Sequence, residues 1–343
     1  MPAEKGSWRN LTNSPGAADR YPVWSPKGDR VAWFSDESGE YRLVVSGQEG
    51  MSGKKVYTIP NPSFFFRPAW SPDAKYIAFT DTHYKLHFVN LETGEVKIAD
   101  TDTYAHPERT MNPVWSPDSK WIAYAKLLGN QYKAIFVYNV ENGEKHMLTD
   151  GMADAISPVW DESGLYLYFL ASTDYGLSTA WLDMSGYDAS TTRSLYMILL
   201  SEDIESPFLP ESDEEKAEEG QAGDKETGKT GKKAKKEETD SEKEDITVTI
   251  DPENIAGRTV AIDMPASNYP SLLAGPANSV FISEIPEGAR GLTLHKYDLK
   301  EKKAEEFIKN ISFATVSADK SSILYMSGSD WAITSTKSPV KGQ

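Results

Sequence analysis

Four tryptophans, Trp24, Trp70, Trp115 and Trp160, recur at an almost constant spacing of 46, 45 and 45 residues. Each stands two residues after a proline, and the first three are followed by Ser-Pro. A period of about 40–45 residues with strand-rich content is typical of a β-propeller, in which each repeat forms one four-stranded blade. The sequence therefore predicts an all-β fold, a β-propeller of four-stranded blades, with function on the loops around a central channel.

Each repeat reads as a series of strands joined by turns. The tryptophan closes an inner strand, and Ser-Pro-Asp-Ser or a similar sequence then forms a type I turn. The second strand is apolar enough to be buried on both faces, whereas the fourth is more polar because it is outermost. The expected second strands are Arg30–Ser35, Tyr76–Thr80, Trp121–Ala125 and Tyr166–Ala171; the third are Tyr41–Ser46, Lys85–Leu91 and Lys133–Val140; the fourth are Lys54–Ile59, Glu95–Asp100 and Lys145–Thr149.

Two degenerate repeats continue the series, with Leu272 and Val316 in the place of the tryptophan. They lie 44 residues apart and so keep the period, which gives six readable blade starts. The gap from Trp160 to Leu272 is 112 residues, so a seventh blade could lie in 180–265 or be built from both termini. We therefore expect residues 1–343 to form a single propeller of six or seven blades, whose last repeat ends at Trp331–Thr334 without a clear outer strand.

The additional residues between the fourth and fifth repeats include a segment whose composition does not support a folded blade. Glu211–Asp245 contains no aromatic residue and no Val, Ile or Leu. Such a segment cannot bury enough apolar surface to offset its chain entropy, so a disordered charged insertion is expected over 202–246. The basic run Lys232–Lys236 could bind an anionic surface, but acidic residues outnumber basic ones around it, which favours a solvated loop.

Composition limits the partners of the chain. Its net charge of −16 and pI of about 4.8 argue against nucleic acid and anionic membranes. No apolar run approaches the roughly 18 residues of a membrane span. We expect a soluble protein, and the absence of cysteine leaves both a cytoplasmic and a periplasmic location open.

Catalytic motifs are scarce, and three weak candidates have ordinary explanations. Ser52–Lys55 matches Ser-x-x-Lys but falls in an expected turn. His83 and His87, with Asp81 nearby, would suit a metal on a helix, yet here they span a turn and a strand. Asp100 and Asp102 lack the other ligands of a calcium loop. We therefore expect no catalytic, cofactor-binding or metal-ligating residue and no cofactor, and we expect the repeated tryptophans to be core residues at blade interfaces.

The long series of repeats resembles the second propeller of tricorn-type proteases. The resemblance covers nearly the whole chain and is carried by Asn10–Gly16, Tyr21–Pro26, Ala32–Tyr41, Trp115–Tyr124, Leu167–Ser172, Ser206–Phe208 and Ile250–Ile255. The Trp-Ser-Pro-Asp repeat alone is less specific, because TolB-like propellers share it.

This resemblance implies a role without catalysis. In that family two propellers precede a helical region, a PDZ domain and a serine-peptidase core that cuts oligopeptides, and the protein assembles into oligomers. The catalytic Ser and His lie in the C-terminal part, so no catalytic residue is carried over to this chain. The resemblance implies that oligopeptides in the propeller channel, other domains of the parent peptidase and other copies of the chain are partners. Two alternatives are a TolB-like interaction scaffold and the gating propeller of a prolyl-oligopeptidase-like enzyme.

Overall fold

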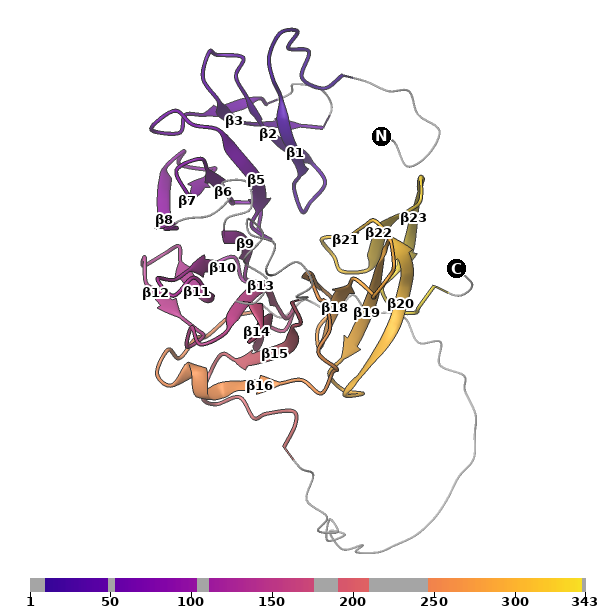
Figure 1. The fold of residues 1–343 in the computed structure, drawn as a ribbon. Coiled ribbons are helices and arrows are strands. Elements are labelled where there is room, and N and C mark those ends of the chain that lie inside the picture. Colours follow the sequence, from indigo (N-terminus) through magenta and orange to yellow (C-terminus); the bar gives the residue numbers. More distant parts are fainter. Residues whose placement is uncertain (1–9, 49–52, 104–110, 176–190, 210–245, 341–343) are drawn as a thin grey trace, which may run out of the picture.

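Six antiparallel sheets follow one another along the chain and stand around a common axis (Figure 1). The structure, a computed structural model, describes residues 10–48, 53–103, 111–175, 191–209 and 246–340. Each sheet is one blade, and its first strand is the one nearest the axis. The blades are blade 1 with β1(Arg20–Trp24), β2(Arg30–Ser35), β3(Arg42–Gly47) and β4(Lys55–Tyr57); blade 2 with β5(Phe65–Trp70), β6(Tyr76–Asp81), β7(Lys85–Asn90) and β8(Val96–Thr101); blade 3 with β9(Met111–Trp115), β10(Trp121–Leu127), β11(Lys133–Asn139) and β12(Lys145–Met147); blade 4 with β13(Asp154–Trp160), β14(Tyr166–Ser172), β15(Ser194–Leu199) and β16(Thr259–Ala261); blade 5 with β17(Ser271–Ala274), β18(Ser279–Glu284), β19(Leu292–Asp298) and β20(Lys303–Ile311); and blade 6 with β21(Phe313–Val316), β22(Ser322–Ser327) and β23(Asp330–Ser335).

The fold class expected from the period is confirmed. Each of the first five blades has four strands in sequence order, and the second strands β2, β6, β10 and β14 are the most buried, as predicted. In the described residues the last blade has three strands, and no outer strand follows β23. Every described strand belongs to one of these six sheets, including β15 and β16, which lie within 180–265 and are part of blade 4. The described parts of 180–265 and of the two termini therefore contain no seventh blade.

In blades 2 and 3 a Ser-Pro-Asp turn closes the inner hairpin through its own side chains. In blade 2, Ser71 Oγ donates to Asp73 Oδ1 and accepts the amide of Tyr76 at 2.9 Å. The carboxylate of Asp73 accepts the amide of Lys75 at 3.0 Å. These bonds satisfy the amides that the tight turn would otherwise leave without partners.

Neighbouring blades are held together by apolar clusters, one for each of the five interfaces. Phe34, Phe65 and Phe79 pack with ring centroids 5.3–5.5 Å apart between blades 1 and 2. Blades 4 and 5 share a cluster around Tyr168 and Tyr297, both fully buried. Because each strand alternates its side chains, one sheet contributes alternate residues to the clusters on its two faces.

The repeated tryptophans join consecutive blades with one recurring hydrogen bond. The indole Nε1 of Trp115 donates to the carbonyl of Ala69 at 2.9 Å, and that of Trp160 to Val114 at 3.2 Å. Trp70 makes the equivalent bond to Val23 at 3.3 Å. In each case the acceptor is the residue before the tryptophan of the preceding blade, so the bond repeats the period of the sequence.

Trp24 corrects the expectation that all four repeated tryptophans are core residues. Its side chain is 54% exposed, whereas Trp70, Trp115 and Trp160 are buried. The described residues place no blade before blade 1, so its indole has neither a preceding sheet to pack on nor a preceding carbonyl to bond. The burial of a repeated residue therefore depends on its neighbour as well as on its place in the repeat.

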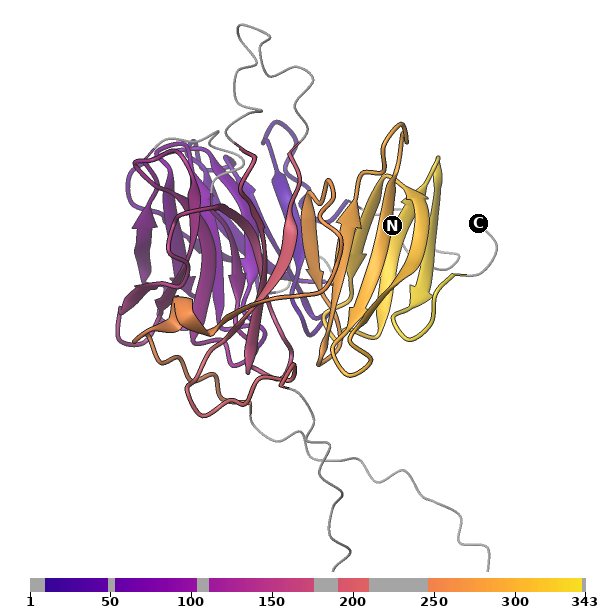
Figure 2. The same ribbon diagram turned by 60° about the horizontal axis from the view of Figure 1, so that its bottom comes forward.

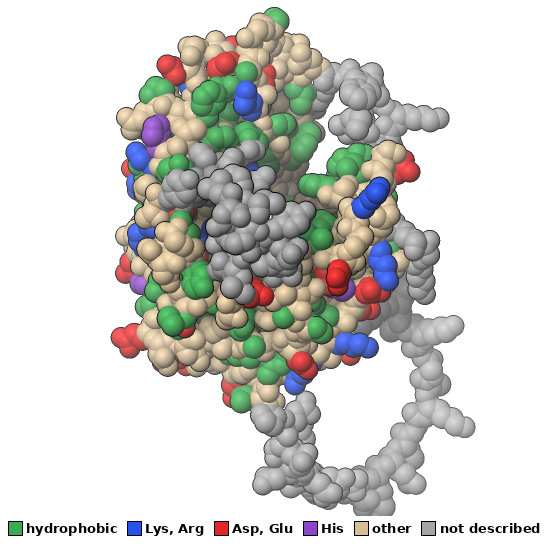
Figure 3. All heavy atoms as spheres, viewed as in Figure 1, with side chains coloured by type: hydrophobic (Ala, Val, Ile, Leu, Met, Phe, Trp, Pro, Cys, Tyr) green, Lys and Arg blue, Asp and Glu red, His purple; other side chains and the backbone are tan. Residues whose placement is uncertain are grey.

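The ring is open between blade 6 and blade 1. No strand of one pairs with a strand of the other in the described part of the chain. Trp331 and Ile333 of β23 are 53% and 66% exposed, and Phe313 packs edge-on against Trp331. Figure 3 shows hydrophobic side chains on both flanks of this opening, which we call the seam. Figure 2 shows blades 5 and 6 beside the earlier blades, with the sheets seen along their edges.

The long gap after Trp160 belongs to blade 4, because β15 and β16 pair although 59 residues lie between Leu199 and Thr259. The flanks of this connection are fixed: Ser201 Oγ donates to Asp251 at 2.6 Å, and the Arg258 guanidinium donates to the carbonyl of Leu199 at 3.2 Å. Of the expected insertion 202–246, residues 210–245 lie outside the described residues, as does the basic run Lys232–Lys236.

Candidate functional site

The inner strands of blades 1 to 4 share a backbone distortion at the residue before their proline. Tyr21, Arg67, Asn112 and Ser157 have φ values of 54°, 48°, 46° and 54°. Positive φ is uncommon for residues other than glycine, and a following proline restricts the backbone further. In each strand the pairing register shifts at this point, which defines a β-bulge. A bulge redirects a side chain, and distortion repeated at one place suggests a functional position.

These four residues, which we call the axial ring, form contacts between blades. The ring of Tyr21 lies edge-on to Phe66 of blade 2, with centroids 6.1 Å apart. Arg67 Nη1 donates to Asn112 Oδ1 of blade 3 at 3.4 Å. Ser157 Oγ accepts the amide of Leu272 in blade 5 at 2.9 Å. Since these contacts join first strands of neighbouring blades, they lie at the wall nearest the axis (Figure 1).

The axial ring retains accessible polar groups. Arg67 and Asn112 are exposed, while Tyr21 and Ser157 are partly exposed. A guanidinium, an amide and a hydroxyl supply donors and acceptors for an extended peptide backbone. The arrangement is suited to contacting a chain that lies along the axis.

The exposed charged residues on the first strands of the blades are all positive in the described chain. Arg20 and Arg67 are the exposed charged residues on β1, β5, β9, β13, β17 and β21 within the described chain, although the whole protein has a net charge of −16. Arg20 lies near the rings of Tyr41 and Phe64, 6.0 and 5.9 Å from their centroids. The only other charge on these strands, Asp154, is buried and lies 3.7 Å from Arg193. The inner wall therefore presents cations.

The histidine pair considered from the sequence does converge on one carboxylate. Asp81 Oδ2 lies 2.9 Å from His87 Nε2 and 3.9 Å from His83 Nδ1. Burial alone would raise the pKa of Asp81, but hydrogen bonds from His87 and from the Lys85 amide outweigh it and lower that pKa. His87 is buried and stacks on Phe79 at 5.3 Å. This geometry is that of a core hydrogen bond, and the described residues contain no group of three or more His, Cys, Asp or Glu that could hold a metal.

Asp100 serves to join blades 2 and 3. Its carboxylate accepts the Tyr124 hydroxyl and Lys126 Nζ, each at 2.8 Å, and Lys145 Nζ at 3.1 Å. Burial opposes ionisation, yet these bonds outweigh it and lower the pKa of Asp100. Asp102 accepts the amide of Leu127 at 3.1 Å, another link to blade 3.

Ser52, the candidate nucleophile of Ser52–Lys55, lies outside the described residues. Lys54 of the same motif forms an ion pair with Glu37. The lysine therefore contacts a carboxylate of the neighbouring hairpin in blade 1.

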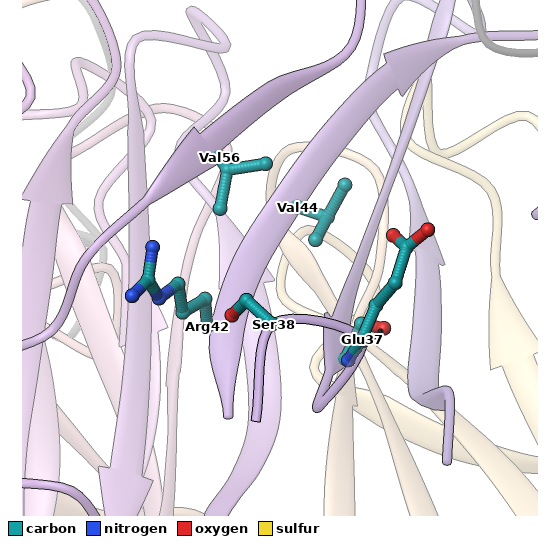
Figure 4. A pocket seen from close by; sticks show the side chains of 6 residues that line it. Glu37, Ser38, Arg42, Val44 and Val56 are labelled. Carbon is teal, nitrogen blue, oxygen red and sulfur yellow. Dashed lines mark hydrogen bonds between the residues drawn. The ribbon is translucent and has the colours of Figure 1, made fainter. Parts of the chain in front are cut away.

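A shallow pocket of about 260 Å³ lies on the face of blade 1 that is turned away from blade 2 (Figure 4). Its apolar wall is formed by Val44 and Val56, which are cross-strand partners on β3 and β4. Arg42, Glu37, Ser35 and Ser38 complete the lining. Because Leu43 and Val45 of β3 face blade 2, this pocket opens on the opposite side, away from that interface.

The axial ring was missed by sequence reasoning, although a signal was present. The residue before proline differs in every repeat, so no motif is visible at that position. The constant Pro-x-Trp spacing places four dissimilar side chains at one structural position, and this alignment could have identified the ring.

The repeated inner bulges, the inter-blade tryptophan bonds and the six sheets define the chain as a six-bladed β-propeller. It belongs to the family described as the tricorn protease second beta propeller domain, whose model matches residues 1–337. The family expected from the sequence resemblance is thus confirmed.

Individual relatives agree with this assignment. The chain is 25% identical over 308 residues to a tricorn protease homolog of Saccharolobus solfataricus, covering 87% of this chain and 25% of that protein. It therefore spans about a quarter of the relative's length. The fold is shared with the crystal structure of the tricorn protease, with a TM-score of 0.65 and 15% identity over 93% of this chain and 31% of that one.

A second solved structure shares the fold at lower similarity. The β-propeller domain of the trilobed protease of Pyrococcus furiosus, described as having an open velcro topology, matches with a TM-score of 0.54 and 11% identity. The match covers 95% of this chain and 86% of that domain. No helix of the described residues is long and apolar enough to cross a membrane.

Proposed function

We propose that this chain is the non-catalytic propeller of a tricorn-type serine peptidase, and that it guides or filters oligopeptides toward a protease core outside the chain. The observation that carries the proposal is the axial ring: the first strands of four blades each carry one residue with the same distorted backbone before proline. Membership of the tricorn second-propeller family supports the peptidase context. Oligopeptides and the other domains of that peptidase are the partners this role requires, and assembly of several copies is a further expectation.

Physical chemistry favours a passage role for the axial ring over a catalytic one. Its members supply hydrogen-bond donors and acceptors but no nucleophile paired with a base. Ser157 Oγ already accepts the Leu272 amide, and no histidine of the described chain is hydrogen-bonded to it. Weak, distributed contacts let a peptide bind and leave, whereas one tight site would retain it.

The alternative interaction scaffold finds support in a different place. Trp331 and Ile333 at the seam are exposed apolar residues of the kind that mark protein contacts. This observation is compatible with contacts to other domains of the same peptidase, so it does not displace the axial proposal.

A bulky polymer attached at the axial ring tests whether oligopeptides pass along the propeller axis. The chain has no cysteine, so Asn112→Cys introduces a single thiol at the axial ring, and Lys303→Cys places a matched thiol on the outermost strand β20. Both variants are made in the proposed full-length peptidase, with any cysteine outside this chain replaced by serine, and are alkylated with a polyethylene glycol maleimide. Modification at 112 is expected to slow hydrolysis of a peptide of about ten residues several-fold, with little effect from modification at 303. Equal rates after both modifications would contradict the axial route.

A further inference from the structure

The guanidinium of Arg67 is the best-placed unmatched charge near the axis. Arg67 is exposed on β5, and it forms no ion pair with a carboxylate of the described chain, whereas Arg30, Arg193 and Arg258 each do. The hydrogen bond that holds it, to Asn112 Oδ1, is long at 3.4 Å. Most of its donors therefore remain available for another acceptor.

Acidic residues exceed basic ones by 16 in the whole chain, so a lack of carboxylates does not explain why Arg67 has no ion pair among the described residues. Its position is fixed by the backbone, because Arg67 and Asn112 both have positive φ and both precede proline. Two neighbouring blades thus use the same distorted conformation to bring a guanidinium beside an amide.

Aromatic residues precede Arg67 along the chain, and one of them contacts blade 1. Phe66 precedes Arg67 on β5 and contacts Tyr21 with centroids 6.1 Å apart. Phe64, which immediately precedes β5, is 52% exposed and lies near Arg20. The first strands of blades 1 and 2 therefore each carry one exposed cation, Arg20 or Arg67, next to an aromatic residue in the sequence.

We propose that Arg67, with Asn112 beside it, binds a carboxylate of the oligopeptide at the axis. The planar guanidinium matches a carboxylate with two parallel hydrogen bonds, and the Asn112 amide supplies a further donor. Phe66 and Tyr21 then contact the adjacent apolar side chain of the peptide. This inference rests on the proposed passage of peptides and names the chemistry that the wall selects.

The carboxylate has two possible sources in a peptide, the C-terminus and an Asp or Glu side chain. Three eight-residue peptides distinguish them: one with a free C-terminus and no acidic residue, the same peptide amidated, and the amidated peptide with one central Glu. Binding of each to the full chain is measured by isothermal titration calorimetry at low salt, because an exposed ion pair is screened at high salt.

Arg67→Gln removes the charge and keeps a polar side chain, and Lys303→Gln removes the same charge from the outermost strand as a control. At least one of the two carboxylate peptides should bind about tenfold more tightly than the neutral peptide, as expected for a charged hydrogen bond. Arg67→Gln should abolish this preference, Arg67→Lys should restore part of it, and Lys303→Gln should leave it intact.

Three outcomes separate this inference from the function on which it rests. If all three peptides bind equally, or if both glutamine variants behave alike, carboxylate selection at Arg67 is wrong while peptide passage stands. If no peptide binds at millimolar concentration, both are wrong. A preference lost only in Arg67→Gln supports both.

Discussion

Trp115 and Trp24 occupy the same place in two repeats and differ in whether a preceding blade is present. Trp115 is 8% exposed, donates to the Ala69 carbonyl at 2.9 Å and stacks on Tyr76 with centroids 5.7 Å apart. Trp24 is 54% exposed. Substitution of each by alanine therefore compares one side chain with and without a blade interface.

The expected loss can be estimated from these contacts. Truncation of a large buried aromatic to alanine costs about 3–5 kcal/mol, which includes the cavity that remains. The indole hydrogen bond accounts for about 1 kcal/mol of this, and the stacked ring for about 0.5–1.5 kcal/mol. Trp115→Ala should therefore lower the free energy of unfolding by about 3–5 kcal/mol, and Trp24→Ala by less than about 1 kcal/mol.

Urea denaturation followed by circular dichroism measures both changes. With a slope of about 3 kcal/mol per M, Trp115→Ala should lower the midpoint by at least about 1 M, and Trp24→Ala by about 0.3 M or less. Trp115→Phe provides an intermediate case, because the ring stays while the N–H donor is lost, at a cost of about 1–2 kcal/mol. Equal midpoint shifts for the two alanine variants would refute the claim that the preceding blade decides the contribution.

Three further perturbations have definite expected outcomes. Burial raises the pKa of Asp161 above its usual value of 3.8 despite bonds from Ser163 and Asn278. Because this pKa is higher in the folded state, the stability of the wild type falls as pH rises from about 4 through that pKa. The unfolding free energy of Asp161→Ser relative to wild type should therefore increase over this pH window, and a pH-independent difference would contradict the prediction. Replacing Glu211–Asp245 by a short linker should move the melting temperature by about 2 °C or less, because closure entropy varies only with the logarithm of loop length; a loss of many degrees would show that the segment packs on the propeller. The chain alone should hydrolyse no fluorogenic peptide, and activity that co-purifies and disappears with one Ser→Ala substitution would overturn this.

The sequence was sufficient for the blades because their signals are local and periodic. The tryptophans, the serine-containing turns and the apolar second strands repeat within one period, and Val316 was correctly aligned without its tryptophan, since it pairs with Ile323 as Trp70 pairs with Ile77. The alignment of Leu272 was wrong by two residues, because Ala274, opposite Val280, holds the tryptophan position of blade 5. The exposure of Trp24 was not predictable in this way, since it depends on which blade lies beside blade 1. The axial ring was also hidden, because a bulge before proline depends on strand pairing and the side chains involved, from Tyr21 to Ser157, share no chemistry.

Photo-cross-linking of a peptide to the chain tests the central claim most directly. An oligopeptide carrying benzoylphenylalanine is irradiated with the full chain, and the modified residues are identified by mass spectrometry. The account predicts cross-links on the inner strands, at or next to Phe66, Arg67, Asn112 and Ser157, that an excess of unlabelled peptide suppresses. Competable cross-links confined to the outer strands, or to the seam residues Trp331 and Ile333, would contradict passage along the axis.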